Sequence, residues 1–313
     1  MGVSDVVGVF TRGFVVGFFL PAYFALVVLD LAVDPRALPA AYRELGEGTQ
    51  LLVAGAVALL VALLLNGLHF QVLRLFEGYA LQRLRDWPES LLGVTPFARW
   101  QRWAIARQQD RYDALAATRE QPERSRARSK AARELARQFP DRREDLLPAR
   151  FGNVIRSFEW HPRSRYNLNG IVAYPRIATM LNDREAELAA DTRADVALFV
   201  NAALLSVVIG ALVAIDCVWH GWWRTGYVAL VVALPPLVYW AAYNGAVSAA
   251  LRWGDAVRTS FDLHRLELYE RLGLRLPTTD AEERQIAHTI NRCLLFGEPL
   301  GDDFRKIPTK ERP

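Results

Sequence analysis

Four long apolar blocks, separated by polar segments, dominate the pattern of this sequence. They cover residues 13–33, 50–70, 196–219 and 225–250. The first holds 21 residues, and a helix of that length reaches about 31 Å, which matches a hydrocarbon layer of roughly 30 Å. Because lipid offers no hydrogen bonds to the backbone, each block is predicted to be a transmembrane helix.

The spacing of the blocks predicts two helical hairpins with cytoplasmic helices between and after them. A short polar loop joins the first two blocks, and the very short HGWWR turn joins the last two. No alternation typical of strands appears outside the blocks, so the predicted fold class is an all-α polytopic membrane protein. Its regions are an N-terminal hairpin over 1–73, a central helical region over 74–195, a second hairpin over 196–250 and C-terminal helices over 251–313.

Arginine near the block ends sets the predicted orientation. Arg74 follows the second block, Arg193 precedes the third and Arg252 follows the fourth, whereas the opposite loops hold fewer basic residues. The positive-inside rule then places both termini and the central region in the cytoplasm, in a multi-pass protein of an inner membrane. Of the 38 basic residues, 35 are Arg, which is typical of GC-rich coding and favours a bacterial source.

The composition agrees with a chain that lies partly in lipid and partly in water. Hydrophobic residues make up 52% of the 313 residues and charged residues 23%, which is too apolar for an ordinary soluble chain and too charged for one made only of spans. The net charge of +4 is spread among nearly as many acids, so no nucleic-acid surface is indicated. Cys217 and Cys293 fall in different environments, which argues against a disulfide or a thiolate metal cluster.

The cytoplasmic regions are predicted to be helices that need a partner. The central region contains the polar stretch EQPERSRARSKAARELARQ, either a linker or an exposed helix, and shows no clear hydrophobic core of its own. In the tail, apolar residues from Val257 to Leu272 recur at helical spacing. Thr279 and Glu282 then form a capping box for a further helix. The apolar stripes of these tail helices are expected to pack on the central region or on another subunit.

Residues 151–181 are predicted to form an elbow that leads toward the third block. Phe151, Val154 and Phe158 lie on one face of a helix, and the turn-forming residues from His161 onward are expected to break it. The apolar run that follows has only 11 residues, too few to span, and Pro175 is expected to prevent an unbroken helix.

The elbow has three interpretations. Its arginines reach lipid headgroups while the aromatic residues pack, it contacts another subunit, or it forms a ligand site. The residue types suit a ligand, but no recognised ligand spacing is present. The candidate residues of this interfacial or ligand elbow are Glu159, His161, Tyr166, Asn169 and Arg176.

Polar residues inside the apolar blocks are candidates for a pore or pathway, because an ionisable group at the centre of a span costs about 2.5 to 3.5 kcal/mol. Ordinary structure explains each of them too, as interfacial carboxylates, amides bonded between helices, and a proline kink. The candidates are Asp30, Asn66, Asn201, Asp216, Pro235, Pro236 and Asn244.

Small residues four positions apart recur in the blocks. Gly13 with Gly17, and Gly210 with Ala214, are examples. Such pairs let helix backbones approach closely, within one chain or between copies. A homo-oligomer is expected on this basis.

The stretch YNLNGIVAYPRI, a Tyr, a turn, an apolar triplet and an aromatic-Pro-Arg sequence, resembles a pattern of uncharacterised four-span bacterial integral membrane proteins. The resemblance covers residues 151–181 and, more weakly, the FDLHRLELYERLGL tail. It implies the four-span topology and carries no activity to transfer. The arrangement of two hairpins with cytoplasmic helices is also similar, in topology alone, to bestrophin-type anion channels.

Two functional hypotheses remain. No P-loop, HExxH, GxSxG, Rossmann glycine fingerprint or paired-cysteine zinc signature occurs, so we expect no enzyme and no cofactor. The first hypothesis is a protein that tethers cytoplasmic helices to the membrane, where they bind a cytoplasmic protein or self-assemble. The second is an oligomeric ion channel whose polar span residues line the path. The expected partners are the lipid bilayer, a cytoplasmic protein and further copies of the chain, without nucleic acid.

Overall fold

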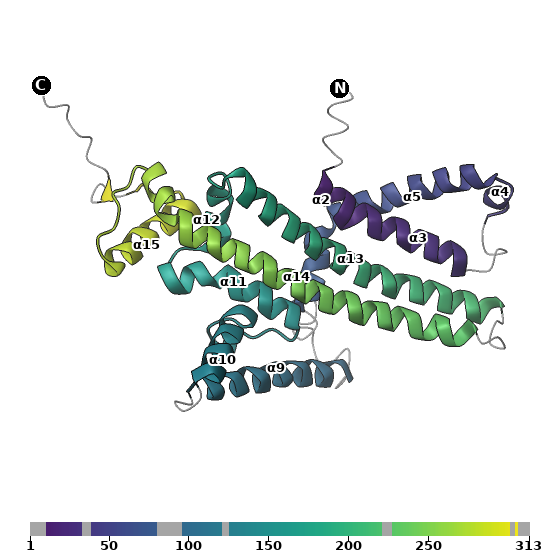
Figure 1. The fold of residues 1–313 in the computed structure, drawn as a ribbon, viewed down its shortest axis with the longest axis horizontal. Helices are drawn as coiled ribbons and strands as arrows, with labels where there is room; N and C mark the ends of the chain where they lie inside the picture. The colour runs from purple at the N-terminus through teal and green to yellow at the C-terminus, as the bar shows by residue number, and fades with distance from the viewer. Residues whose placement is uncertain are drawn as a thin grey trace, which may run out of the picture. The chain divides into compact units, whose positions relative to one another are not determined.

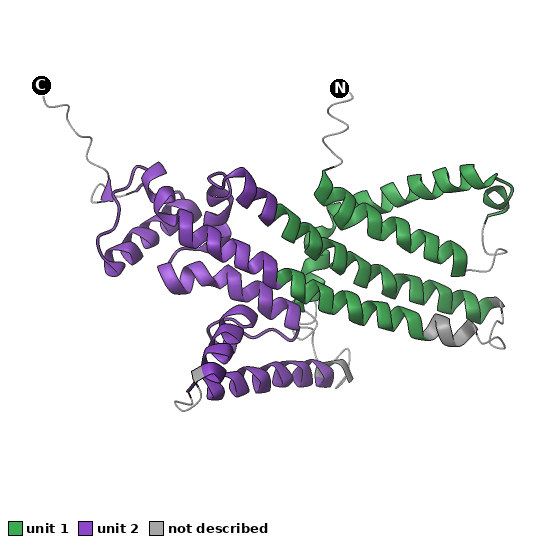
Figure 2. Ribbon diagram, viewed as in Figure 1, with its two compact units in different colours: residues 1–80, 190–250 green, residues 81–189, 251–313 purple. Residues whose placement is uncertain are grey.

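The computed structural model is built from helices (Figure 1). It describes residues 11–32, 39–79, 96–120, 125–220, 227–300 and 304–305. No strand occurs in these ranges, apart from an isolated bridge between Leu274 and Arg305. The predicted all-α class is therefore confirmed. The chain divides into unit 1, residues 1–80 and 190–250, and unit 2, residues 81–189 and 251–313 (Figure 2).

Unit 1 holds the most apolar helices. Its first helix consists of α2 (Arg12–Phe14), a π-helical turn η1 (Val15–Phe19) and α3 (Leu20–Ala32). There follow α4 (Ala40–Arg43), α5 (Glu47–Gly67) and α6 (His69–Glu77). Two long helices, α13 (Asp183–His220) and α14 (Tyr227–Arg271), contribute residues to both units.

Three helices in the described part of the chain are long and apolar enough to cross a membrane. They are Arg12–Ala32, Glu47–Gly67 and Asp183–Trp219, and they contain the first three predicted blocks almost entirely. Residues 227–250 of the fourth block fall within α14, which is not among the three. The predicted hairpin turns fall largely on residues 33–38 and 221–226, outside the described residues.

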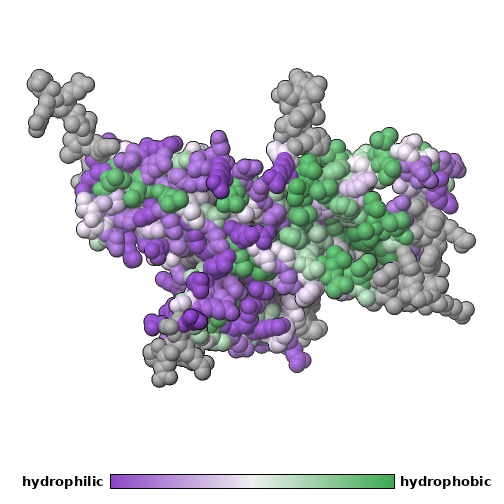
Figure 3. All heavy atoms as spheres, in the orientation of Figure 1, coloured by the Kyte–Doolittle hydropathy of each residue, from purple (hydrophilic) through white to green (hydrophobic). Residues whose placement is uncertain are grey.

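The apolar helices of unit 1 leave large hydrophobic side chains on the surface. Leu52 is 76% exposed, Leu64 66% and Phe24 62%. Only 17% of the most apolar window of α5 is buried. Figure 3 shows hydrophobic residues gathered over the unit 1 helices and mainly hydrophilic residues over unit 2. An apolar surface of this kind favours lipid as the solvent of unit 1.

Small residues bring the helices of unit 1 into close contact, as predicted. A Cβ atom on Gly17 would lie 2.9 Å from the Cβ of Ala197, and one on Gly210 would lie 2.8 Å from the Cβ of Pro235. At the first of these crossings the Asn201 amide donates a hydrogen bond to the Gly17 carbonyl oxygen, at 2.8 Å. Glycine is therefore required where α13 passes η1.

Unit 2 is a helical bundle with its own buried residues. Its helices are α9 (Pro96–Glu120), α10 (Ser125–Gln138), α11 (Arg150–Tyr166), α12 (Gly170–Ile177), α15 (Asp280–Phe296) and the short 3-10 turn η3 (Arg143–Asp145), together with its parts of α13 and α14. The polar stretch that was either a linker or an exposed helix contains α10, so the helical alternative holds.

The central region does have a core, which corrects the prediction from the sequence. Leu135, Phe139 and Leu146 form one buried cluster. Phe151 from the centre and Phe261 from the tail are also buried, at 0% and 1% exposed. The cluster of Leu135, Phe139 and Leu146 belongs wholly to the central region, whereas Phe261 comes from α14, and α15 packs on both α11 and α12. The tail helices therefore pack on the central region as expected, and the pattern of that region alone could not show the part of the core that they supply.

The breaks predicted at His161, Pro162 and Pro175 are wrong, whereas the turn predicted at Asn167 and Asn169 is confirmed, because it separates α11 from α12. Helix α11 continues through His161 and Pro162 and ends only at Asn167, which has a left-handed φ of 62°. Helix α12 likewise runs over Pro175. A proline inside a helix costs about 3 kcal/mol, and the burial of apolar side chains of α11 offsets that cost, since Phe151, Val154 and Phe158 are 0%, 0% and 3% exposed.

Helix α15 in the tail begins and ends where the sequence predicted. The Thr279 hydroxyl accepts a hydrogen bond from the Glu282 N–H at 3.2 Å and so caps α15. The Glu282 carboxylate accepts from the Thr278 N–H at 2.7 Å, one residue before the position that a regular capping box uses. Gly297, with φ 70°, ends α15.

The Gly17 crossing leads to a paired prediction. Gly17→Ala should destabilise the protein by about 1 to 3 kcal/mol, because its methyl group must push η1 away from α13. Gly55→Ala in α5 is the matched control, since a Cβ there meets nothing within 4 Å and alanine favours a helix. Both variants can be compared by thermal unfolding in detergent. Equal unfolding temperatures would show that the crossing is looser than described.

Candidate functional site

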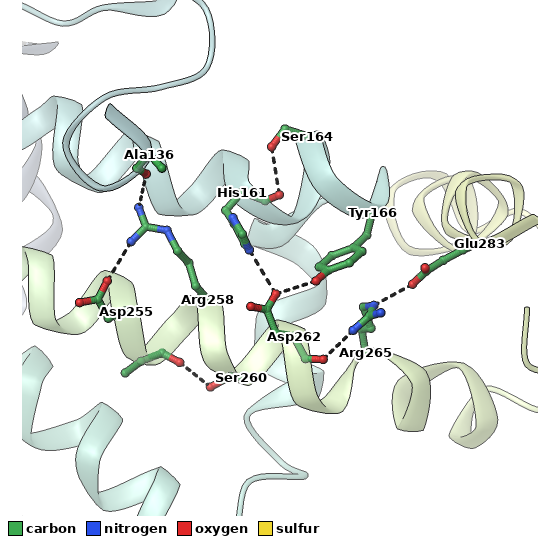
Figure 4. Close-up of polar contacts among 11 residues, drawn as sticks. Ala136, His161, Ser164, Tyr166, Asp255, Arg258, Ser260, Asp262, Arg265 and Glu283 are labelled. Carbon is green, nitrogen blue, oxygen red and sulfur yellow. Dashed lines mark hydrogen bonds and ion pairs between the residues drawn. The ribbon is translucent and has the colours of Figure 1, made fainter. Parts of the chain in front are cut away.

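Charged residues form a stripe along one face of α14 in unit 2. Asp255, Arg258, Asp262 and Arg265 follow one another at spacings of three, four and three residues. Such a spacing keeps them on one side of a helix. Figure 4 shows Arg258, Asp262 and Arg265 joined to groups of α10, α11 and α15, respectively, and Asp255 joined to Arg258 of its own helix.

The carboxylate of Asp262 is the centre of this network. Its Oδ1 accepts a hydrogen bond from the Tyr166 hydroxyl at 2.7 Å and lies 3.2 Å from Nε2 of His161 (Figure 4). Both ring residues come from the end of α11. Two of the predicted elbow residues therefore meet at Asp262, which was not a candidate in the sequence analysis.

The pKa shifts in this cluster have separable causes. Burial alone would raise the pKa of Asp262, but hydrogen bonds from Tyr166 and His161 outweigh it and hold the pKa below its usual value. Burial lowers the pKa of His161, against the opposing influence of Asp262. Burial and the bond to Asp262 both raise the pKa of Tyr166. At neutral pH the cluster thus consists of a carboxylate with a neutral imidazole and a neutral phenol.

Arg265 connects the cluster to α15. Its Nε donates to the Glu283 carboxylate at 2.8 Å, and its guanidinium lies 4.1 Å from the centroid of the Tyr166 ring. Burial works to lower the pKa of Arg265, but the bond to Glu283 raises it. The guanidinium is therefore committed to a contact inside unit 2, where it holds the Tyr166 ring in place by a cation–π interaction.

The other half of the stripe fastens α10. Arg258 donates to the Ser157 hydroxyl at 2.7 Å and to the Ala136 carbonyl at 3.0 Å. Asp255 receives two bonds from Arg137 in α10. A fork-shaped pair of this kind fixes orientation as well as distance. Through these bonds α14 positions α10 and α11.

The turn between α11 and α12 is held by a side chain of α15. The Asn291 amide donates to the Asn167 carbonyl at 2.7 Å and accepts from the Asn169 N–H at 2.8 Å. The Asn169 side chain accepts from the N–H groups of Ile171 and Val172 and so caps α12. The side-chain oxygen of Asn169, a predicted ligand residue, is therefore occupied in capping α12.

A polar pocket borders the network at α15. It has a volume of about 240 Å³ and is lined by Arg165, Tyr166, Arg265, Asp280, Glu283 and Arg284. Arg265 is paired with Glu283, but neither Arg165 nor Arg284 forms an ion pair within the described residues. Two exposed guanidiniums without a carboxylate partner can bind an anionic group.

The other two elbow residues lie outside the network. Arg176 turns back to donate to the Val172 carbonyl of its own helix, at 2.6 Å. Glu159 is half-buried, and burial raises the pKa of its carboxyl, partly offset by Arg156. The Glu159 side chain makes no hydrogen bond or ion pair in the part of the chain that the structure describes.

The predicted pathway residues make contacts of different kinds in unit 1. Asn201 is buried and bonded to Gly17, whereas Asn244 donates to the Trp240 carbonyl of its own helix at 2.8 Å. No hydrogen bond joins Asn66, Asn201 and Asn244 to one another. Among the remaining four candidates, Asp30 and Pro236 are exposed and Asp216 is buried. Pro235 is half-buried and packs near Gly210.

No group of three or more His, Cys, Asp or Glu side chains in the described ranges is arranged to hold a metal ion. The sequence reading missed Asp262, Arg265 and Glu283. The alternating charges of α14 at three- and four-residue spacing were the available signal for the first two, because they mark a face that is paired rather than solvated.

A double-mutant cycle on Tyr166→Phe and Asp262→Ala tests the central bond, because alanine removes the Oδ1 acceptor. We expect a coupling of about 1 kcal/mol near neutral pH. Because the folded pKa of Asp262 is depressed, its contribution is complete above the unfolded value of about 3.9 and is lost as the pH falls through the folded pKa. Thermal unfolding from neutral to strongly acidic pH measures this. Additive effects at neutral pH would exclude the bond.

Glu159→Gln should raise the unfolding temperature in a pH-dependent way. The raised folded pKa means that ionising Glu159 costs stability as the pH rises through that value, and glutamine removes the cost. The gain should be full at alkaline pH and disappear below about pH 4, where the carboxyl is protonated in both states. The exposed Glu144→Gln is the control. A gain that does not change with pH would contradict the assignment.

Comparisons with protein-family models, with curated proteins and with solved structures return no match to this chain. The functional conclusion therefore rests on the geometry described above.

Proposed function

We propose that this protein is a membrane-anchored binding protein, without enzymatic activity, whose unit 2 captures an acidic segment of a cytoplasmic protein. The apolar part of α14 serves as a fourth span beside the three apolar helices of unit 1. Both termini and unit 2 lie in the cytoplasm, and the membrane is the inner membrane of a bacterium. The proposal also includes self-association through the small-residue faces of the spans.

The observation that carries the proposal is the pocket at α15. Three guanidiniums and two carboxylates line it, which gives a formal charge of 3 − 2 = +1. Glu283 is neutralised by Arg265, and Asp280 lies in the first turn of α15, where the helix dipole favours a negative charge. Arg165 and Arg284 are both exposed to solvent, and the Arg165 guanidinium lies 5.9 Å from the centroid of the Tyr166 ring.

The rigidity around the pocket supports binding of a partner. Tyr166 is only 8% exposed, and it is held by Asp262 on one side and by Arg265 over its ring. Asn291 clamps the adjoining turn. Because these groups are fixed before a partner arrives, binding loses little conformational entropy. Acidic side chains suit the surface by charge, and their attraction should weaken with salt.

The polar residues of the apolar helices favour a tether over a conducting path. An ion path needs polar groups that face a shared, water-filled space. Asn201 instead joins two helices, and Asn244 bonds to its own helix. Hydrogen bonds of this kind are the usual role of amides between membrane helices. The channel hypothesis thus gains no support from these side chains.

The double variant Arg165→Gln/Arg284→Gln should weaken binding of a glutamate-rich peptide to the full chain in detergent. Loss of two cations near the ligand predicts a decrease of about tenfold at low salt, because each surface pair contributes up to about 1 kcal/mol. Fluorescence anisotropy of a labelled peptide measures it. Arg271→Gln is the matched control, since that residue pairs with Glu267 and does not line the pocket.

Two results would overturn the proposal. One is equal affinity for the glutamate peptide and for a glutamine peptide of the same length. The other is a conductance of reconstituted vesicles that disappears when Asn201 or Asn244 is replaced, because this would show that the polar span residues line a path.

A further inference from the structure

A second cavity lies within unit 1, where the ends of three apolar segments meet. Its volume is about 360 Å³. Its walls come from the start of the first helix, from the junction of α5 and α6, and from α13. The side chains that bring polar atoms to it are Thr11, Asn66, His69 and Arg193, and the other lining residues are glycine, alanine, leucine and phenylalanine.

The polar wall of this cavity carries positive charge and hydrogen-bond donors. No carboxylate is among the described residues that line the cavity. The Arg193 side chain forms no ion pair or hydrogen bond in the described part of the chain, and it is exposed. An unpaired guanidinium beside neutral donors, with no acid to compensate it, is an arrangement that attracts an anion.

His69 supplies the second observation that points to a ligand. Its Nδ1 is buried and has no hydrogen-bond partner among the residues that the structure describes. The ring is held in place by an edge contact with Phe18, at 5.2 Å between centroids. Buried polar atoms normally have partners, and one left unsatisfied costs about 1 to 3 kcal/mol. A ligand that accepts a hydrogen bond from Nδ1–H would remove this cost.

Two further donors complete the wall. The Asn66 side chain makes no hydrogen bond within the ranges described, so its NH₂ group is available. The Thr11 hydroxyl oxygen accepts from the Phe14 N–H at 3.3 Å, which leaves the hydroxyl proton free to be donated. Guanidinium, imidazole, amide and hydroxyl together match the several acceptor oxygens of a phosphate group.

The position of the cavity along the helices corresponds to a lipid headgroup. Thr11 immediately precedes the first apolar helix, and Asn66 is the second-last residue of α5. Arg193 stands three residues before the third apolar block begins at Val196. Three independent segments therefore change from apolar to polar at this cavity, as they must where a membrane ends.

The surface beside the cavity is apolar enough for acyl chains. Leu63 lines the cavity and is 44% exposed, while Leu64 and Phe70 are 66% and 63% exposed. The Gly17–Ala197 crossing lies next to the cavity, since Ala197 is also a lining residue. A ligand with a phosphate and hydrocarbon chains would satisfy the donors and cover the exposed leucines at once.

We propose that this cavity binds a phosphate anion, with Arg193 as its charge partner and His69, Asn66 and Thr11 as hydrogen-bond donors. The source of the phosphate is either a phospholipid headgroup or inorganic phosphate, and the apolar surface beside Leu63 favours the lipid. The site lies in unit 1 and does not depend on the peptide-binding role proposed for unit 2.

The test measures two probes on the full chain in detergent by isothermal titration. One probe is dihexanoyl phosphatidylglycerol, a short-chain anionic phospholipid, and the other is inorganic phosphate. Arg193→Gln should weaken binding of the lipid by about fivefold, the effect of one basic residue near a headgroup. His69→Phe keeps a ring against Phe18 and removes both ring nitrogens, so it should also weaken binding.

Arg184→Gln is the matched control because Arg184 is an exposed residue of α13 that does not line the cavity. Its affinity for both probes should equal that of the original chain. Elution volume and unfolding temperature show which variants are folded. Should Arg193→Gln fail to fold, His69→Phe decides the question alone.

Each outcome has one meaning. Weaker binding of both probes, or of the lipid alone, supports the phosphate site with a lipid as its source, and weaker binding of phosphate alone supports the site with inorganic phosphate as its source. Affinities that are the same in the folded cavity variants and in Arg184→Gln overturn the proposal, and so does the absence of binding by the original chain. Binding of the glutamate peptide should be unchanged in all three variants, which separates this test from that of unit 2.

Discussion

Lipid cannot form hydrogen bonds with a peptide group, so a segment that lies in it must satisfy its backbone internally and face outward with apolar side chains. Unit 1 meets both requirements. Its three apolar helices bond within themselves and leave residues such as Leu52 and Leu64 exposed. In water this surface would be a liability for aggregation. Placed in lipid it is satisfied, and the contacts between the helices are left to small residues and a few amides.

The same constraint explains where polar chemistry occurs in the protein. Asn201 is tolerated in an apolar helix because it bonds to Gly17 at a close crossing. Unit 2, rich in charge, instead uses ion pairs and hydrogen bonds to choose which helices meet, with Asp262 and Arg258 as the main anchors. Exposed guanidiniums and unpartnered donors are found at its α15 pocket and at the cavity of unit 1 that His69 and Arg193 line. At these two places, hydrogen-bond donors and positive charges remain available for a ligand.

The sequence predicted the parts of the fold that depend on local pattern. The first three apolar blocks, the helical class, the Thr279 cap and the end of α15 at Gly297 all follow from residues close together in the chain. It failed where distant contacts decide. The core of the central region needs Phe261 from the tail, and Pro162 stays inside α11 because the packing of that helix outweighs the local cost of a proline.

The candidate site was predicted only in part, for the same reason. His161 and Tyr166 were chosen by residue type, and they do meet, but on Asp262, which lies about a hundred positions later in the sequence. Asn169 was chosen as a possible ligand residue and turned out to cap a helix. Residue types alone cannot separate a cap from a ligand, because both use the same oxygen atoms.

The account depends most on lipid being the solvent of the apolar helices. Extraction of the host membranes with alkaline carbonate tests it directly, because this treatment releases proteins held by charge and leaves those that span the hydrocarbon layer. We predict that the full chain stays in the membrane pellet and enters solution only with detergent. Release into the supernatant as a soluble, monodisperse protein would contradict the account.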